Sequence, residues 1–193
     1  MKIFINGTEA EVRTDNLSQL AEVIEIIKTV IDPEHMITTI LIDGRELREP
    51  DWASSLAQFS DSNMEIETGK PEEFVNARLA ASSNVVRACF LEFRDARKFF
   101  QDGKMQQGNQ RLVEAVHTLQ AFFEWYSTML ELMPKERRPQ YDIRQKAEEI
   151  SEVCKKICQQ QLYQSWWALG ETLKSELEPK IDQLEDFCRG FVQ

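Results

Sequence analysis

The feature that most constrains the fold is a pair of stripes of mainly apolar residues between Phe74 and Met133, on either side of Gly103. Their members recur at alternating spacings of three and four, which places side chains on one face of an α-helix. Gly103 can adopt the left-handed conformation that ends a helix. The stretch is therefore predicted to form two long helices joined as a hairpin. The first stripe comprises Val75, Leu79, Ser82, Val86, Cys89, Phe93, Ala96 and Phe100, and the second comprises Leu112, Val116, Leu119, Phe123, Tyr126, Leu130 and Met133.

The second helix carries further apolar residues beside its stripe. So wide an apolar surface is not expected to stay in water. Two explanations are open: neighbouring helices on two sides within the protein, or a groove for a partner helix. The second explanation predicts homodimerisation through helices, and it makes three of the flanking residues candidates for partner binding, Phe122, Trp125 and Met129. The flanking residues are Ala115, Phe122, Trp125, Met129 and Leu132.

A third stripe follows a polar loop and is too long for one straight helix. A continuous helix from Ile143 to Phe191 would be roughly 75 Å long, whereas each hairpin helix would be roughly 45 Å. A break is therefore expected, either at Pro179, which removes a backbone donor, or at Gln159–Gln161. This arrangement predicts a bundle of three or four helices. The stripe comprises Ile143, Ala147, Ile150, Cys154, Cys158, Leu162, Trp166, Leu169, Leu173, Leu177, Ile181, Leu184, Cys188 and Phe191.

Two aromatic residues lie beside this third stripe. Trp167 directly follows Trp166, and successive side chains on a helix point about 100° apart, so the two tryptophans cannot both face one neighbour. Tyr163 and Trp167 are therefore candidates for partner binding, because tryptophan is favoured in interface hot spots. Packing between the domains is the alternative role.

The first 69 residues have the shorter periods and the turn signals of a small sheet. Asn6-Gly7 and Asp43-Gly44 are tight-turn dipeptides, and Asp15 or Asn16 can cap a helix that ends at Asp32-Pro33. The expected order is strand, strand, helix, strand, short strand, strand, which is the order of a β-grasp domain. The expected strands are 2–5, 9–14, 38–42, a short one at Leu47, and 64–68, with a helical turn at 54–59.

Within this region the sequence resembles ubiquitin. The similar segments are Met1-Lys2-Ile3-Phe4-Ile5, residues 40–47 and the stretch from Ser55-Leu56 to Met64-Glu65-Ile66. The resemblance implies a β-grasp fold. It does not extend to conjugation, because Gly69-Lys70-Pro71 replaces the Gly-Gly tail and the chain continues. Nor does it extend to the ubiquitin-binding patch, where Leu41 matches the patch isoleucine but Glu67 replaces its neighbouring valine.

The boundary between the two regions is expected at Gly69-Lys70-Pro71, because proline can begin a helix and the following glutamates suit the positive end of its dipole. The sequence therefore predicts an α+β protein with a ubiquitin-like domain at 1–69 and an all-α bundle at 70–193. A second resemblance lies inside the bundle. Residues 93–129, through Asp102-Gly103-Lys104-Met105, are similar to the central hairpin of the flagellin-secretion chaperones, small bundles that hold an unfolded export substrate along apolar grooves.

Charge and cysteine content limit the functional classes. The net charge is −10, of which residues 1–70 carry −8, and an acidic surface repels nucleic acid. No apolar run approaches the roughly 20 residues that span a bilayer. The N-terminus has no apolar run behind a basic start, so no signal peptide is expected. The four cysteines lie in predicted helices on or near apolar stripes, which is typical of reduced thiols and favours a cytoplasmic location.

The residues that could perform chemistry are too scattered to predict a reaction. Cys154 and Cys158 share a helix face, but no second pair of zinc ligands accompanies them. Glu114 precedes His117 by three residues, whereas di-iron bundles use paired copies of that spacing. His35 lies in a loop. No phosphate-binding glycine loop or serine nucleophile motif occurs, so no enzyme activity, metal or other cofactor is expected.

The leading functional expectation is thus a non-enzymatic cytoplasmic interaction module, an adaptor or scaffold that binds a protein partner. The first alternative is a secretion-type chaperone that binds an export substrate along the bundle. The second alternative is a helical metalloprotein or enzyme. The expected protein binds neither nucleic acid nor membrane.

Overall fold

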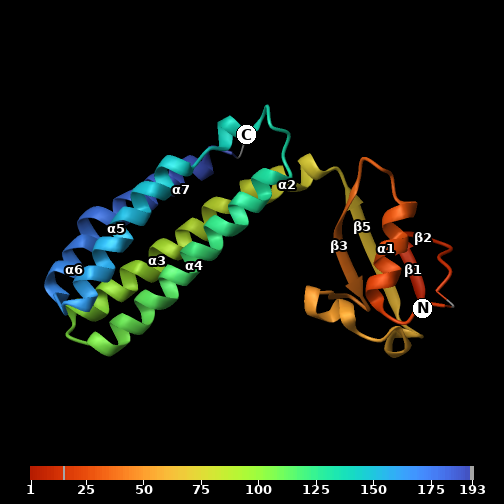
Figure 1. The fold of residues 1–193 in the computed structure, drawn as a ribbon, viewed down its shortest axis with the longest axis horizontal. Helices are drawn as coiled ribbons and strands as arrows, with labels where there is room; N and C mark the ends of the chain where they lie inside the picture. Colours follow the sequence, from red (N-terminus) through yellow and green to blue (C-terminus); the bar gives the residue numbers. More distant parts are fainter. Residues whose placement is uncertain (15, 192–193) are drawn as a thin grey trace. The chain divides into compact units, whose positions relative to one another are not determined.

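The computed structural model describes residues 1–14 and 16–191. The chain divides into two compact units, Met1–Phe74 and Val75–Gln193. We call them the sheet unit and the helical unit. Together they make an α+β protein in which a mixed sheet precedes a set of helices (Figure 1).

The sheet unit contains one mixed five-stranded sheet. Its strand order is β2-β1-β5-β3-β4. The two strands β1 and β5 pair in parallel, and the other neighbouring strands are antiparallel. The strands are β1 (Lys2–Ile5), β2 (Thr8–Glu9), β3 (Met36–Ile42), β4 (Arg45–Glu46) and β5 (Asn63–Gly69), and two 3₁₀ turns, η1 (Glu49–Ala53) and η2 (Leu56–Phe59), precede β5.

One face of this sheet is buried together with helix α1 (Leu20–Val30), which packs its apolar face into the same core. Successive strand residues alternate between the two faces, so Ile40 and Ile42 of β3 and Met64 and Ile66 of β5 point into the core. Residues between them, such as Leu41 and Glu65, lie on the opposite face. The core comprises Ile3, Leu20, Val23, Ile24, Ile27, Ile40, Ile42, Met64 and Ile66.

Two sequence predictions for the sheet unit are wrong in detail. The return strand pairs only at Thr8–Glu9 instead of running from 9 to 14, because Val12 donates its N–H to Ala10 and the chain turns away from β1. Helix α1 begins at Leu20, after the predicted caps. Of these caps, Asp15 lies outside the described residues, and Asn16 precedes the helix by four positions.

The carboxylate of Glu22 performs the capping at the start of α1. It accepts the backbone N–H of Ser18 at 2.6 Å and that of Gln19 at 3.0 Å. These hydrogen bonds lower the pKa of Glu22, since they favour its ionised form. A glutamate in the first turn therefore replaces the expected side-chain cap.

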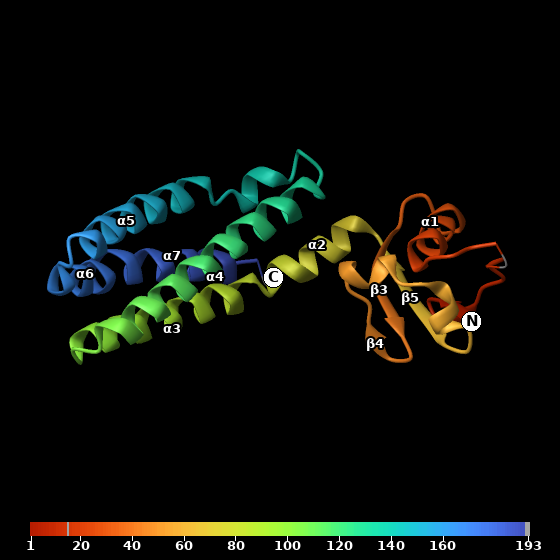
Figure 2. The same ribbon diagram turned by 60° about the horizontal axis from the view of Figure 1, so that its bottom comes forward.

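The helical unit is built from helices, most of which are joined by short turns (Figures 1 and 2). Helix α3 packs against α4 and α7, and α5 packs against α6 and α7. The predicted hairpin is confirmed for α3 and α4, which are joined at Gly103, whose φ is +75°. The first predicted helix is not continuous, because it is interrupted at Ala81, between the end of α2 and the start of α3. The elements are α2 (Pro71–Ala80), α3 (Ser82–Gln101), α4 (Met105–Glu131), the 3₁₀ turn η3 (Arg138–Tyr141), α5 (Arg144–Leu162), α6 (Trp166–Thr172), the π-helical turn η4 (Leu173–Leu177) and α7 (Glu178–Arg189).

All eight residues of the first predicted stripe are buried, including Ser82, whose hydroxyl donates to the carbonyl of Leu79. The second stripe has the wrong rotational phase. Val116, Phe123 and Leu130 are only half-buried. Three flanking residues take their place inside the unit, so the buried face of α4 comprises Leu112, Ala115, Leu119, Phe122, Tyr126 and Met129, continued by Met133.

The third stripe breaks after Leu162, directly beyond Gln159–Gln161, and Pro179 does not break it. The π-helical turn η4 precedes Pro179, and the N–H of Glu178 donates to the carbonyl of Leu173, five residues earlier. This wider turn lets the proline follow without ending the helix. The stripe is also out of phase in α5, which buries Val153 and Ile157 and leaves Cys158 and Leu162 exposed.

Candidate functional site

Three large apolar side chains are exposed together where α5 turns into α6. Leu162, Tyr163 and Trp167 are 82%, 81% and 82% exposed. We call these three residues the end surface. In the described part of the chain no other large apolar side chain is as exposed, the next being Val30 at 59% in the sheet unit.

A tight turn and an aromatic stack hold the end surface in place. The turn reverses the chain through Gln164, whose φ is +53°, and the N–H of Ser165 donates to the carbonyl of Gln160 at 2.8 Å. The ring of Trp166 stacks on that of Phe100 of α3, with centroids 5.7 Å apart and an angle of 11° between the planes. Because Trp166 faces α3, Trp167 projects in a different direction, into solvent.

Beside the end surface lies a shallow depression of about 460 Å³. It is formed between the end of α3, the start of α4 and helix α6. Its walls combine apolar and aromatic surface with a few polar groups, which is the usual composition of a binding cleft. The lining residues are Phe100, Gln101, Met105, Trp166, Trp167, Gly170 and Glu171.

The five residues predicted to bind a partner fall into two groups. Tyr163 and Trp167 lie on the end surface. Phe122 and Met129 are only 2% and 8% exposed and lie within the helical unit, while Trp125 is half-buried against the ring of Phe122. Ala115, Phe122 and Met129 of the apolar flank of α4 thus pack within their own unit, which removes the observation that motivated a groove at Phe122 and Met129, while Leu132 is 40% exposed.

Leu162 was not predicted to lie on the surface, because this residue continues the apolar spacing of α5. The three glutamines before it were the available signal. Leu162 directly follows the glutamines and is the last residue of α5. Because the helix ends there, no further helical turn covers the Leu162 side chain.

A second depression, of about 500 Å³, lies between the C-terminal part of α4, η3 and the start of α5. We call it the basic groove. Its floor contains Phe123, Leu130, Ile143 and Ala147, and its rim carries the bases Lys135, Arg138 and Arg144 and the acids Glu131 and Asp142. Beneath it, the hydroxyl of Tyr126 donates to the carbonyl of Tyr141 at 2.8 Å, and burial raises the pKa of Tyr126.

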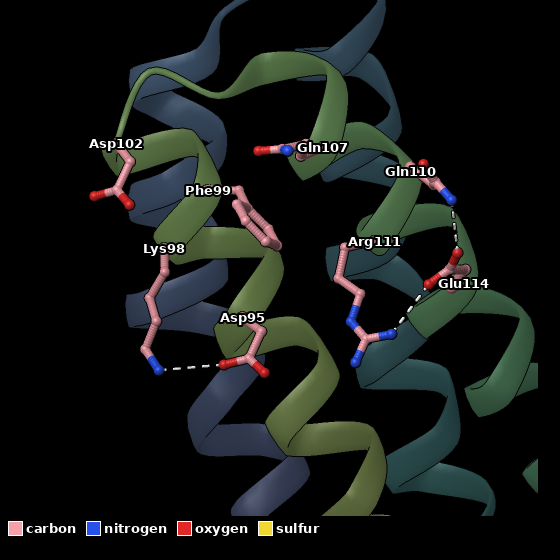
Figure 3. A pocket seen from close by; sticks show the side chains of 8 residues that line it. All are labelled: Asp95, Lys98, Phe99, Asp102, Gln107, Gln110, Arg111 and Glu114. Carbon is pink, nitrogen blue, oxygen red and sulfur yellow. Dashed lines mark hydrogen bonds and ion pairs between the residues drawn. The ribbon is translucent and has the colours of Figure 1, made fainter.

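A third depression, of about 510 Å³, separates α3 from α4 near their connecting turn. Figure 3 shows Phe99 between two sets of charged residues that pair within their own helices. Lys98 contacts Asp95 at 3.2 Å, and Arg111 contacts Glu114 at 3.0 Å. Hydrogen bonds from Arg111 and Gln110 lower the pKa of Glu114, so the charges of this depression are engaged with one another.

The uncovered face of the sheet is polar and acidic. A depression of about 710 Å³ on this face is lined by Phe4, Leu41, Glu65 and Glu67, among others. Leu41 lies opposite Glu65 in the strand register, and Glu67 lies opposite Thr39. The carboxylates interrupt the apolar surface that Phe4 and Leu41 would otherwise form.

The candidate catalytic and metal-binding residues do not assemble into a centre. His117 is exposed on α4, and the carboxylate of Glu114 is bound by Arg111 and Gln110. Cys154 is largely buried, which raises its pKa to about 11, whereas Cys158 is exposed. Among residues 1–14 and 16–191, no group of three or more histidine, cysteine, aspartate or glutamate side chains could hold a metal ion.

None of the helices in the described part of the chain is both long enough and apolar enough to cross a bilayer.

Residues 1–70 match the family described as the TP0873 N-terminal domain, a description that states no activity. No curated protein and no solved structure is detectably similar to the chain. The match ends at Lys70, so it covers the sheet and α1 and leaves α2 and the later helices outside it. It confirms neither the ubiquitin-like nor the chaperone resemblance.

Proposed function

We propose that the protein is a non-enzymatic interaction module, an adaptor or scaffold, that binds a protein partner through the end surface. One observation carries the proposal: Leu162, Tyr163 and Trp167 are each more than 80% exposed and lie within six consecutive residues. Exposed apolar groups that cluster in this way are typical of interaction sites. Tyrosine and tryptophan are also the residues most enriched in interface hot spots.

The fold does not require these three side chains. The α5–α6 turn is closed by backbone hydrogen bonds, from Tyr163 to Gln159 and from Ser165 to Gln160. Helix α6 is fixed by Trp166 and by the buried Leu169. The end surface therefore contributes little to stability, which supports a role in binding.

The test compares two double variants of the full chain as affinity baits in lysate of the source cells, followed by quantitative mass spectrometry. Tyr163→Ser/Trp167→Ser removes the end surface. Val85→Ser/Val113→Ser removes two other exposed apolar side chains of the helical unit, which are 40% and 46% exposed. We expect the first variant to lose about tenfold or more in recovery of the main partner, as for a hot spot, and the second variant to match the wild type. Equal recovery by all three baits would contradict the proposal.

A secretion-type chaperone is the second proposal, and the basic groove favours it. This groove is a depression with an apolar floor on the helical unit, and part of its floor, Phe123, belongs to the segment that resembles the flagellin-secretion chaperones. The recovered partner distinguishes the proposals. An adaptor binds the folded partner, whereas a chaperone binds only its unfolded form, so calorimetry with both forms decides between them.

For the sheet unit, we propose a ubiquitin-like β-grasp fold. The strand order β2-β1-β5-β3-β4, the parallel β1/β5 pair and the position of α1 between β2 and β3 support it. An experimental structure of the whole chain would test this proposal by superposition on β-grasp domains. A helix packed on the opposite face of the sheet would refute it.

Two further proposals concern the state of the protein. Four free cysteines support a reducing, cytoplasmic environment, which fractionation of the source cells can test.

If copies associate, we expect the end surface to mediate the contact. Light scattering at high concentration should then give twice the 22.5 kDa of one chain, and Trp167→Ser should restore the single mass.

A further inference from the structure

The basic groove has an incompletely covered apolar floor. Ile143 is buried, while Phe123, Leu130 and Ala147 are half-buried. In the described part of the chain α4 packs closely against α3 and much less against α5. The two helices are connected through η3 instead of a tight turn (Figure 2). The separation of α4 and α5 exposes the floor.

Bases outnumber acids on the rim of this groove by three to two. Arg138 donates to the backbone carbonyls of Glu131 and Met133, both at 2.9 Å, and these bonds leave its charge without a carboxylate partner among the described residues. Lys135 is exposed and forms no ion pair with any residue that the structure describes. Only Arg144 is paired, with Asp142. The carboxylate of Glu131 is the opposing charge on the rim.

The segment around the basic groove differs from the whole chain in the sign of its net charge. Residues 134–146 carry five bases and two acids, a net charge of +3, in a protein of net charge −10. An acidic protein repels acidic partners over most of its surface, and a local basic region reverses this effect. An acidic ligand is therefore attracted to this part of the helical unit.

We propose that the basic groove binds an acidic amphipathic helix of a partner protein. Its apolar side chains, at every third or fourth position, would cover Phe123, Leu130 and Ala147. Its flanking carboxylates would meet Lys135 and Arg138. Helices that bury one apolar face in a groove between other helices are a common mode of peptide recognition, and the cationic rim selects the acidic members of that class.

This inference rests on the proposed role of the helical unit as an interaction module, but it uses other residues than the end surface. Met105 lines the depression beside Trp167, and Ser127 lines the basic groove. Both belong to α4, and their separation of 22 residues corresponds to about 33 Å along the helix. Substitutions at one site can therefore fail or succeed independently of those at the other.

The test uses the full chain and a fluorescein-labelled synthetic peptide of about 18 residues, long enough for several helical turns. Leucine occupies one helical face of the peptide, and glutamate flanks it. Two matched peptides separate the contributions: in one peptide lysine replaces glutamate, and in the other serine replaces leucine. Fluorescence anisotropy should give at least about tenfold tighter binding for the acidic amphipathic peptide than for either control, as expected when charge and apolar contact both contribute.

Two single variants then locate the site. Lys135→Glu changes an exposed residue, so it leaves the fold intact, and it should weaken binding about fivefold to tenfold through charge reversal. Leu130→Ser should weaken binding by a similar factor, with circular dichroism confirming that the helices remain. The double variant Tyr163→Ser/Trp167→Ser is the matched control, and it should bind the acidic peptide as the wild type does.

Photo-crosslinking from the centre of the acidic peptide should label residues 123–147. The inference is overturned if the lysine peptide binds as tightly, which would indicate a merely apolar surface, or if the serine peptide does, which would indicate charge alone. It is also overturned if Lys135→Glu leaves the affinity unchanged, or if the cross-links fall on residues 162–167. The test of the end surface uses other variants and a different measurement, so it stands apart from these four outcomes.

Discussion

Two turns at the same end of the helical unit reverse the chain in the same way but are built from different residues. The first joins α3 to α4, and the second joins α5 to α6. Each places one residue at positive φ, Gly103 at +75° and Gln164 at +53°. The residue after it then donates its N–H to a carbonyl five residues earlier, Lys104 to Phe99 at 2.9 Å and Ser165 to Gln160 at 2.8 Å.

These hydrogen bonds are those of the Schellman motif, in which glycine is the favoured residue at positive φ. The first turn follows that preference and is flanked by the charged residues Asp102 and Lys104. The second turn has a glutamine in the strained position and three exposed apolar side chains around it. Since both turns perform the same structural task, folding alone does not explain the unusual residues of the second turn, and this difference supports the proposed role of the end surface.

The largest expected effect on stability is a difference between substitutions of the two adjacent tryptophans of α6. Trp166→Ala removes the stack on Phe100 and should lower the free energy of unfolding by about 2 kcal/mol, less than for a fully buried tryptophan because Trp166 is half-buried. Trp167→Ala removes an exposed ring and should change it by less than about 0.5 kcal/mol. Urea unfolding followed by circular dichroism at 222 nm measures both.

The wild type and Phe100→Leu are the controls for this pair. The leucine variant loses the ring stack but retains apolar volume, so it should lie between the wild type and Trp166→Ala. Equal losses for Trp166→Ala and Trp167→Ala would show that the end surface is part of the core, and the contrast between the two turns would then disappear.

How much of the fold the sequence determines depends on the width of each apolar face. In α3 the predicted stripe is narrow, and all its residues are buried. In α4 apolar residues extend on both sides, so the spacing was compatible with several rotations of the helix. The structure favours the one that buries Ala115, Phe122 and Met129. Contacts with neighbouring helices, which the sequence does not record, select that rotation.

The candidate site was predictable to a similar extent. Tyr163 and Trp167 were predictable, because the local geometry of a helix is enough to show that two adjacent tryptophans cannot face the same neighbour. The basic groove was not predicted, since it depends on how far α4 and α5 diverge around η3. From the sequence, the segment before the third stripe was predicted only to be a polar loop, because no local pattern shows which rim its bases would form.

The next effect concerns the packing between the two turns. A Cβ atom at Gly108 would approach the Phe100 ring to 2.9 Å, and that ring is held by Trp166. Gly108→Ala should therefore destabilise the protein by about 1 to 2 kcal/mol, although alanine is the better helix former. Thermal unfolding monitored by circular dichroism is the measurement.

Gly170→Ala is the matched control, because it is also a glycine within a helix but its added Cβ would meet no atom within 4 Å. It should stabilise the protein by about 0.5 to 1 kcal/mol through helix propensity. If both substitutions stabilise the protein, the close contact between Gly108 and Phe100 has no energetic consequence.

A smaller loss is expected at the first turn. An added Cβ at Gly103 would meet nothing within 4 Å, so only the positive φ opposes a side chain there. Gly103→Ala should lower the free energy of unfolding by about 1 kcal/mol. The strain of a side chain at positive φ destabilises the folded state, and the reduced flexibility of the unfolded chain offsets part of this loss. Gly103→Asn should cost less, because asparagine tolerates this conformation. Urea unfolding that ranks alanine above asparagine would contradict this account.

The smallest effect is a gain at the second turn, and it tests the comparison directly. Gln164→Gly relieves the same strain that Gly103→Ala introduces, while it makes the unfolded chain more flexible, so the protein should be stabilised by about 0.5 kcal/mol. Gln164→Ala retains a Cβ at positive φ and should give no gain. The measurement is the urea midpoint of both variants beside the wild type. If glycine at 164 is neutral or destabilising, the side chain of Gln164 contributes to the turn, and the second turn is optimised for folding in its own way.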